Sequence, residues 1–287
     1  MSSNFYLNNS SFPYLSCSKR YALQVVTGLK PPPGGNKYIA AGLAFHKMMQ
    51  IIGTEACPNI QMAIMFGDKS KLHPLILAIP EVQQLQLAQM AQRIYTENPS
   101  LYADAIRESH FEYHWPADPE SATRCGTIDL ISYDPSSDTV ILTDYKTTAK
   151  PIDGSLITNY SLSSQRFFYQ LAAYHLDLPP HFQSAILEHR IAWRYCYVAY
   201  EKDQYHLAQP TLINLAELET FARLFNEKAI YADALHNDPS LAVKEGILSG
   251  QCWRCPFTSI CSSENETHMI ETWPYGRADY NPKHNDE

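Results

Sequence analysis

The sequence predicts an α/β fold, and three observations support this class. Segments with apolar residues at helical spacing lie before and after a central region of strand-like segments. Apolar residues make up 45% of the 287 residues, which is enough for a packed core. Two of the strand-like segments meet at a short polar turn, as they do in a hairpin. We therefore expect one large domain, residues 1–262, followed by a polar tail, residues 263–287.

The individual elements follow from turn residues and from periodicity. A loop at 31–35, which holds three prolines and two glycines, precedes a predicted helix at about 39–52. A second helix follows Pro80, where apolar residues recur at helical spacing. Strands are expected at about 106–115, 125–133, 139–147, 193–200 and 205–209, a polar loop at 148–163, and further helices at about 164–176 and 215–235.

Composition excludes several classes of protein. No run of about 18 apolar residues occurs, and the N-terminus has no basic start before an apolar stretch, so we expect neither a membrane span nor a secretory leader. Three of the seven cysteines lie within ten residues, which favours metal or cluster ligation in the cytoplasm over disulfides. The other cysteines besides Cys17, namely Cys57, Cys125 and Cys196, have no ligand-like spacing and should be buried. The net charge of −8 does not favour nucleic-acid binding, although it says little about a single cleft.

Two acids are predicted to lie opposite each other on the central hairpin. If its loop is 135–138, residue 134 pairs with 139 and Asp129 with Asp144, whereas a loop of another length would turn Asp129 to the other face. Lys146 shares the face of Asp144, because strand side chains alternate. Two carboxylates beside an ammonium suit a hard divalent cation such as Mg²⁺. The alternative is an ordinary hairpin with a surface Asp–Lys pair, since such short motifs are frequent.

The order of the motifs adds to this interpretation. Gly126-Thr-Ile-Asp129, then Asp144-Tyr-Lys146, then Gln170-Leu-Ala-Ala-Tyr174 resembles the RecB-type branch of the PD-(D/E)xK nucleases. The resemblance implies a restriction-endonuclease-like core, a central mixed sheet flanked by helices, that hydrolyses phosphodiesters with Mg²⁺ or Mn²⁺. It makes Asp129 and Asp144 metal ligands and Lys146 the catalytic lysine. Gln170 and Tyr174 would then belong to the catalytic face of a helix; without the resemblance they would be a buried tyrosine and its partner.

Further candidate metal ligands lie earlier in the sequence than the hairpin. Gly42-Leu-Ala-Phe-His46 resembles the helix that supplies a metal-binding histidine in the same branch, although a histidine among apolar residues is commonly a core residue. Glu108 and Glu112 are both candidates for an additional acid, and their spacing does not choose between them.

The cysteines form a second candidate site. Cys252, Cys255 and Cys261 have the spacing Cys-x2-Cys-x5-Cys, and Cys17 is the best fourth ligand. This arrangement resembles the iron–sulfur nucleases, among them the AddB nuclease domain and the small CRISPR-associated exonucleases. It implies a [4Fe–4S] cluster held by these four residues and joining the N- and C-terminal segments. Zinc in the same positions is the competing interpretation.

The resemblance to these nucleases implies the function of a metal-dependent DNA exonuclease, acting on single-stranded DNA from a 5′ end. Partners would be a CRISPR integrase or recombination proteins, and a homo-oligomer is compatible with the sequence. Aromatic and basic residues that could contact a strand, or simply pack, are Tyr160, Arg166, Phe167, Phe168 and Tyr169. Two rival functions remain: a structure-specific or double-strand DNA endonuclease, and a non-catalytic DNA-binding adaptor with a structural zinc or iron–sulfur site.

Overall fold

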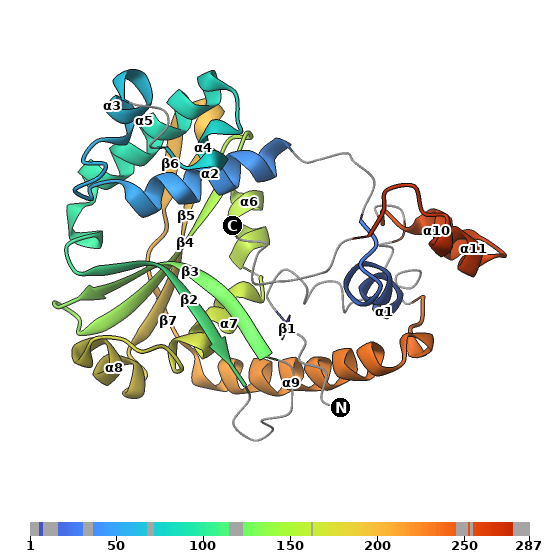
Figure 1. Cartoon of the computed structure of the whole chain (residues 1–287). Helices are drawn as coiled ribbons and strands as arrows, with labels where there is room; N and C mark the ends of the chain where they lie inside the picture. The colour runs from blue at the N-terminus through green and yellow to red at the C-terminus, as the bar shows by residue number, and fades with distance from the viewer. Residues whose placement is uncertain are drawn as a thin grey trace. The chain divides into compact units, whose positions relative to one another are not determined.

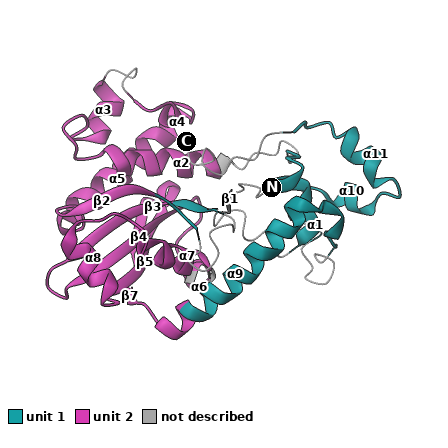
Figure 2. Cartoon of the chain, turned by 60° about the horizontal axis from the view of Figure 1, so that its bottom comes forward, with its two compact units in different colours: residues 1–34, 111–126, 219–287 teal, residues 35–110, 127–218 magenta. Residues whose placement is uncertain are grey.

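The computed structural model describes residues 6–7, 17–30, 37–67, 72–114, 123–161, 163–244, 252 and 255–277. The chain forms two compact units, which are coloured separately in Figure 2. Unit 1 comprises Met1–Gly34, Phe111–Gly126 and Glu219–Glu287, and unit 2 comprises Gly35–His110 and Thr127–Leu218. The proline- and glycine-rich loop expected at 31–35 lies outside the described residues.

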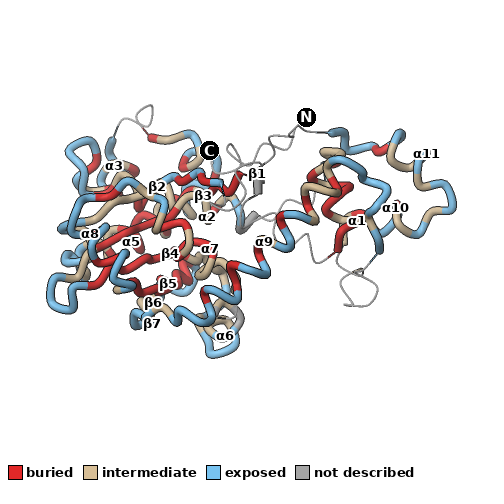
Figure 3. The backbone as a smooth tube through the Cα atoms, turned by 90° about the horizontal axis from the view of Figure 1, so that it is seen from below, coloured by how far each residue is buried: buried red, intermediate tan, exposed pale blue. Residues whose placement is uncertain are grey.

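A mixed seven-stranded sheet is the centre of the fold. Its strands are β1 (Tyr6–Leu7), β2 (Ala105–Tyr113), β3 (Thr123–Asp134), β4 (Thr139–Thr148), β5 (Ile191–Ala199), β6 (Gln204–Leu207) and β7 (Thr211–Leu212). The order is β1-β3-β4-β5-β6, with β2 paired to β3 and β7 to β5. Strands β4 and β5 run parallel, and every residue of β5 is buried (Figure 3). Burial on both faces is what a central parallel strand requires.

Helices cover both faces of the sheet in unit 2. They are α2 (Lys37–Ile51), α3 (Ile60–Phe66), α4 (Pro74–Leu77), α5 (Glu81–Glu97), α6 (Gly154–Ser161), α7 (Gln165–Ala173) and α8 (Pro180–Leu187), with short 3₁₀ turns at Pro99–Leu101 and Tyr200–Lys202. Figure 1 shows α2 and α5 on one side of the sheet and α7 and α8 on the other. Apolar residues of α2 and α5 pack on Tyr145, Cys196 and Val198 of the sheet, so α2 is held against the strands that carry the candidate site.

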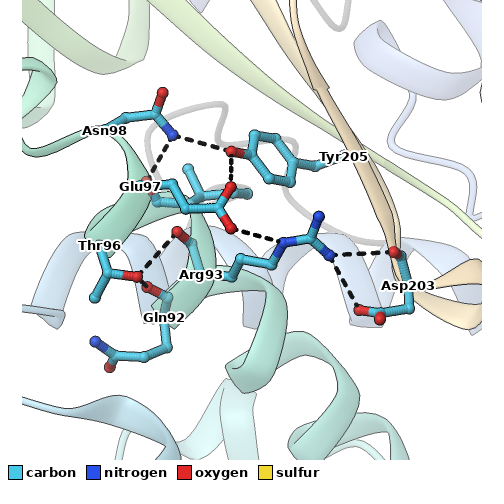
Figure 4. A network of polar contacts seen from close by, with 8 residues as sticks. Gln92, Arg93, Thr96, Glu97, Asn98, Asp203 and Tyr205 are labelled. Carbon is cyan, nitrogen blue, oxygen red and sulfur yellow. Dashed lines mark hydrogen bonds and ion pairs between the residues drawn. The ribbon is translucent and has the colours of Figure 1, made fainter.

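Polar contacts fasten the end of α5 to the turn between β5 and β6 (Figure 4). Arg93 bonds Glu97 at 3.1 Å and reaches Asp203 at 3.6 Å. Asn98 donates to the Tyr205 hydroxyl at 3.2 Å, and this hydroxyl donates to Glu97. These contacts join the end of α5 to the β5–β6 turn at the surface.

Unit 1 brings segments near the two ends of the chain together. It contains α1 (Ser18–Tyr21), a π-helical turn (Ala22–Val26), most of α9 (Leu215–Asn237), a 3₁₀ turn (Pro239–Leu241), α10 (Thr258–Ser262) and α11 (Glu266–Glu271). A small core joins Leu23 and Leu29 to Phe257, Ile260 and Trp273. The Trp273 indole N–H donates to the carbonyl of Lys30 at 2.8 Å, and Lys30 N–H donates to Gly276. The segment after residue 262 thus carries α11 and the buried Trp273 as far as residue 277; residues 278–287 lie outside the described part.

Most predicted elements are confirmed, with small shifts at their ends, but the polar loop expected at 148–163 is wrong. It contains α6, because the Asp153 carboxylate accepts the Leu156 N–H at 2.8 Å and caps the first turn. Helix α7 ends at Ala173, before Pro179, and Pro180 is the first residue of α8, a helix that the sequence analysis did not predict. The sequence analysis also missed α3 and α4. Among the described helices, none is both long and apolar enough to span a membrane.

Candidate functional site

The β3–β4 hairpin has the register expected from a four-residue turn. Paired residues run from Asp134–Thr139 to Leu130–Thr143, which confirms the predicted loop. Asp138 adopts a left-handed backbone, φ 49°, which closes this turn. Continuing the register by one residue places Asp129 across from Asp144, and both side chains are buried. Two carboxylates therefore lie side by side where the hairpin enters the core.

Side chains take over from backbone pairing at this point. The Asp129 carboxylate accepts the backbone N–H of Tyr145 at 2.8 Å and bonds Nδ1 of His46 at 3.1 Å. His46 Nε2 donates to the carbonyl of Tyr145 at 3.1 Å. Because Nε2–H is held by a carbonyl, Nδ1 is the nitrogen directed at the carboxylates, an orientation typical of metal-binding histidines.

The position of His46 depends on a close approach of α2 to β4. A Cβ atom at Gly42, one turn before His46, would lie 3.2 Å from the Thr147 hydroxyl oxygen. A larger residue would push the helix away from the strand or displace Thr147. The glycine that precedes His46 in the sequence thus has a structural reason: it lets the imidazole reach the edge of the hairpin.

A third acid completes a compact group. Ligand atoms of His46, Glu108 and Asp129 all lie within 4.8 Å of one another. Glu108 is within β2 but has φ 50°, a left-handed conformation that is uncommon for this residue type and is found at functional sites. The structure therefore selects Glu108 over Glu112 as the additional acid, a choice that the sequence left open.

Asp144 is engaged on both of its oxygens. Oδ2 lies 2.6 Å from the Lys146 ammonium, and Oδ1 accepts the side-chain amide of Gln165 at 2.8 Å. The same amide of Gln165 also donates to the Tyr169 hydroxyl at 3.1 Å. Gln165 was missed in the sequence, although Gln165-x3-Tyr169 repeats, five residues earlier, the spacing of Gln170-x3-Tyr174.

Gln170 and Tyr174 have surroundings different from those of Gln165. Gln170 is 3% exposed and lines a pocket beside β5. Tyr174 follows the helix and its hydroxyl lies 2.8 Å from Nδ1 of His189. Their assigned roles therefore stay predictions, and the amide that contacts a candidate metal ligand belongs to Gln165.

The charges of the site influence one another strongly. Burial disfavours the charged form of Asp129, but His46 and Lys146 together hold its pKa below the usual value. Burial also disfavours a charged His46, yet Asp129 and Glu108 outweigh it and raise the His46 pKa to about 9. For Asp144, burial dominates over Lys146 and raises the pKa to about 6.

Lys146 keeps its positive charge at neutral pH. Burial favours its neutral form, but Asp144 and Asp129 outweigh that effect, and the pKa lies above the ordinary lysine value. The ammonium is consequently a hydrogen-bond donor and a counter-charge, and has no free lone pair with which to act as a base.

The donor set suits a divalent metal ion. One imidazole and two carboxylates form the compact group. Asp144 adds a third carboxylate close by: its charge raises the pKa of His46, and the charge of Asp129 raises the pKa of Asp144. Carboxylate-rich sites bind Mg²⁺, and a histidine among them is compatible with Mn²⁺. Two positive charges, on His46 and Lys146, face the three carboxylates of Glu108, Asp129 and Asp144.

Fold and site together define a nuclease with an α/β core. The chain matches the PD-(D/E)XK nuclease superfamily over residues 12–262 and therefore belongs to it. Nucleases of this superfamily use divalent metals, and the group formed by His46, Glu108 and Asp129 can bind one. A search of curated proteins finds no match to this chain.

The cysteine region in unit 1 is organised differently. Cys17 is buried at the start of α1, and Cys255 and Cys261 pack at the edge of the small core around Phe257. Thr258 ties the turn together, since its hydroxyl donates to the carbonyls of Cys252 and Cys255. Burial, with Cys255 and Cys17 nearby, raises the pKa of Cys261 to about 11.

The four cysteine sulfurs do not form a tight group in the described residues. The group of His46, Glu108 and Asp129 is the one set there whose ligand atoms all lie within 4.8 Å. Four thiolates on one zinc ion, each about 2.3 Å from it, would be closer than that. Cys57, Cys125 and Cys196 are buried, at 4%, 0% and 0% exposure, which confirms the expectation for them.

Proposed function

We propose that this protein is a metal-dependent DNA exonuclease that cuts single-stranded DNA from a 5′ end. The observation that carries the proposal is the convergence of Asp129, Asp144 and Lys146 at one end of the β3–β4 hairpin, with His46 and Glu108 beside them. The choice of a single strand and of a 5′ end rests on the resemblance to iron–sulfur exonucleases. That resemblance also suggests partners among recombination proteins or CRISPR integrases.

In this proposal His46, Glu108, Asp129 and Asp144 hold one or two Mg²⁺ or Mn²⁺ ions. A bound ion lowers the pKa of a water ligand and stabilises charge on the phosphoryl oxygens. The protein fixes the ligands beforehand: Tyr145 N–H holds Asp129, the Tyr145 carbonyl holds His46, and Gln165 holds Asp144. Such outer contacts orient ligands and are worth about 10- to 100-fold in metal affinity or activity.

Lys146 has the role of a fixed cation. Its ammonium bonds Asp144 and is charged at neutral pH, so it can donate to the attacking water or to a phosphate oxygen. It does not remove a proton from the water in its charged form. The acceptor for that proton would be solvent or a carboxylate.

We further propose that Cys17, Cys252, Cys255 and Cys261 hold a [4Fe–4S] cluster. The support is their spacing together with the packing of residues 17–30 on residues 255–277 within unit 1. Ligation would close a loop of more than 200 residues, which constrains the unfolded chain and stabilises the folded one. The cluster would have a structural role.

The test is cleavage of single- and double-stranded DNA, labelled at the 5′ or the 3′ end, with Mn²⁺ or with EDTA. We expect Mn²⁺-dependent release of short products from the 5′ end of single strands. Lys146→Ala should abolish this, while Lys150→Ala, at an exposed lysine just after β4, should not. Internal cuts in duplex DNA would replace the exonuclease by an endonuclease, and intact DNA with every metal would favour a binding protein.

A further inference from the structure

A pocket of about 430 Å³ lies beside β5 in unit 2. Strand β5 supplies an aromatic wall, Trp193, Tyr195 and Tyr197, of which each side chain is less than 5% exposed. Helices α6 and α7 supply Ile157, Phe167 and Gln170, and residues of the segment 208–214, most of them exposed, complete the lining. We call this the β5 pocket.

The β5 pocket adjoins the catalytic pair through the strand register. In the parallel ladder Asp144 pairs with Tyr195 and Lys146 with Tyr197, so the four side chains stand on one face of the sheet. The Lys146 ammonium lies 6.0 Å from the centre of the Tyr195 ring. The aromatic row continues from Tyr195 to Trp193 at 5.3 Å between ring centres. A strand whose phosphate contacts Lys146 therefore has an aromatic pocket about one nucleotide away.

The lining fits a base better than a phosphate. Arg166 and Glu217 are the charged side chains at the rim, and they pair with each other at 3.3 Å. Arg194 points to the opposite face of the sheet, where it donates to the Thr143 hydroxyl at 2.9 Å. The rest of the lining is aromatic and aliphatic, with side-chain amides from Gln170, Gln209 and Asn214, and such groups contact base faces and base edges.

We propose that the β5 pocket receives an unstacked base of the strand being cut, at the nucleotide next to the scissile phosphate. The inference rests on the proposed nuclease function, and it adds to it a subsite that requires a single strand, since a paired base cannot enter. In such an exonuclease, one base in the β5 pocket and one phosphate at Lys146 together set which bond is cut.

The first test uses 5′-labelled single-stranded DNA with one abasic residue placed at successive positions. Loss of the bound base should slow cleavage about tenfold, because one stacked base contributes about that much. The slow step should occur at one phosphodiester bond, at a fixed distance from the abasic residue. Uniform cleavage wherever the abasic residue stands would overturn the proposal.

A variant that fills the pocket gives the second test. Thr211 is exposed and pairs with Trp193, so its side chain stands on the pocket face of β7. Thr211→Trp should slow cleavage of normal DNA to the rate seen with the abasic residue and remove the difference between the two substrates. Leu187→Trp, at a residue of α8 that is 71% exposed and outside the pocket, is the matched control and should keep that difference. Gln209→Ala is a milder change that should reduce it.

Binding separates this inference from the proposed function. Fluorescence anisotropy in EDTA, with normal or abasic oligonucleotides, needs no cleavage. Weaker binding of the abasic strand by wild type, and equal binding by Thr211→Trp, would support the pocket even if the protein cut no DNA. Equal binding of both strands by wild type would reject the pocket even if the protein were an active nuclease.

Discussion

The two candidate sites of this protein lie in different units and are built in different ways. The acids of unit 2 project from three strands of 9 to 12 residues each. A backbone group or a neighbouring side chain holds Asp129 and Asp144 in place. The cysteines of unit 1 lie on or beside the four-residue α1 and the five-residue α10, around a small apolar core. The acidic site is therefore assembled by the sheet together with α2 and α7, which supply His46 and Gln165. In our proposal a bound cluster or zinc ion would fix the positions of the cysteines.

This contrast predicts that chemistry and stability can be separated by mutation. Changes at the acids should remove cleavage and leave the fold intact, because the hairpin core does not depend on them. Changes at the cysteines should loosen unit 1 and leave the geometry of the acidic site unchanged. The following experiments would sharpen or break the comparison, beginning with the largest effect.

Replacing Asp144 should have the largest effect on activity. Asp144→Ala removes a candidate metal ligand and the partner of Lys146, and we expect cleavage of single-stranded DNA to fall about a thousandfold or more. The neighbouring acid Asp129 still balances the ammonium, so the thermal unfolding midpoint should change little. Initial rates and a melting curve on the same preparation test both statements. Full activity in the variant would show that the site is elsewhere.

Metal affinity should depend on pH in a defined direction. Without metal, His46 has a pKa of about 9 and is protonated at pH 7, so a metal that binds it must displace a proton. Apparent affinity for Mn²⁺ should rise about tenfold per pH unit between pH 7 and 8, the range below that pKa. It should fall further below pH 6, where Asp144 also takes up a proton.

Calorimetric titration in buffers with different ionisation heats measures the proton release directly. His46→Ala is the matched variant, and it should bind Mn²⁺ more weakly but without the slope between pH 7 and 8. A wild-type affinity that does not change over this range would exclude His46 as a ligand.

The two glutamines of α7 should have separable effects. Gln165→Ala removes the amide that holds Asp144, and we expect the Mn²⁺ concentration needed for half-maximal cleavage to rise about tenfold. Gln170→Ala alters the β5 pocket and should raise the KM for single-stranded DNA at an unchanged metal requirement. Cleavage rates over a range of Mn²⁺ and DNA concentrations distinguish the two. If Gln170→Ala raises the Mn²⁺ concentration needed for cleavage and Gln165→Ala does not, the assignment must be reversed.

Cys255→Ser should have the smallest effect on the chemistry and a clear effect on stability. We expect loss of iron and of visible absorption, and an unfolding midpoint lower by about 5 °C or more. The rate per folded molecule should stay close to that of wild type. Cys57→Ala, at a buried cysteine of unit 2, is the control that should retain iron. A colourless wild-type protein that contains zinc would decide for the competing ligand.

The hairpin and its acids could be predicted because few alternatives exist. A four-residue turn with alternating strands on either side allows one register, and this register places Asp129 across from Asp144. The hairpin inference depends on local periodicity, which the sequence displays directly. His46 is a candidate only through the resemblance of Gly42-Leu-Ala-Phe-His46 to a helix of the nuclease family.

Other parts of the site could not be predicted, for identifiable reasons. Gln165 and Gln170 each precede a tyrosine by four residues, and only packing decides which amide reaches Asp144. Glu108 joins His46 through a left-handed backbone within a strand, a local irregularity that periodicity does not reveal. The β5 pocket combines residues 157–217, and no motif announces it.

The end of the hairpin also offers a way to observe the site without any substrate. The Tyr145 amide is protected by the Asp129 carboxylate, a side chain, where its neighbours in the ladder are protected by backbone carbonyls. Its hydrogen exchange with solvent should therefore follow the movements of that carboxylate. When the carboxylate turns to another partner, this amide should exchange faster while the remainder of β4 stays protected. One backbone proton thus becomes a reporter of how firmly the acidic site is set before DNA arrives.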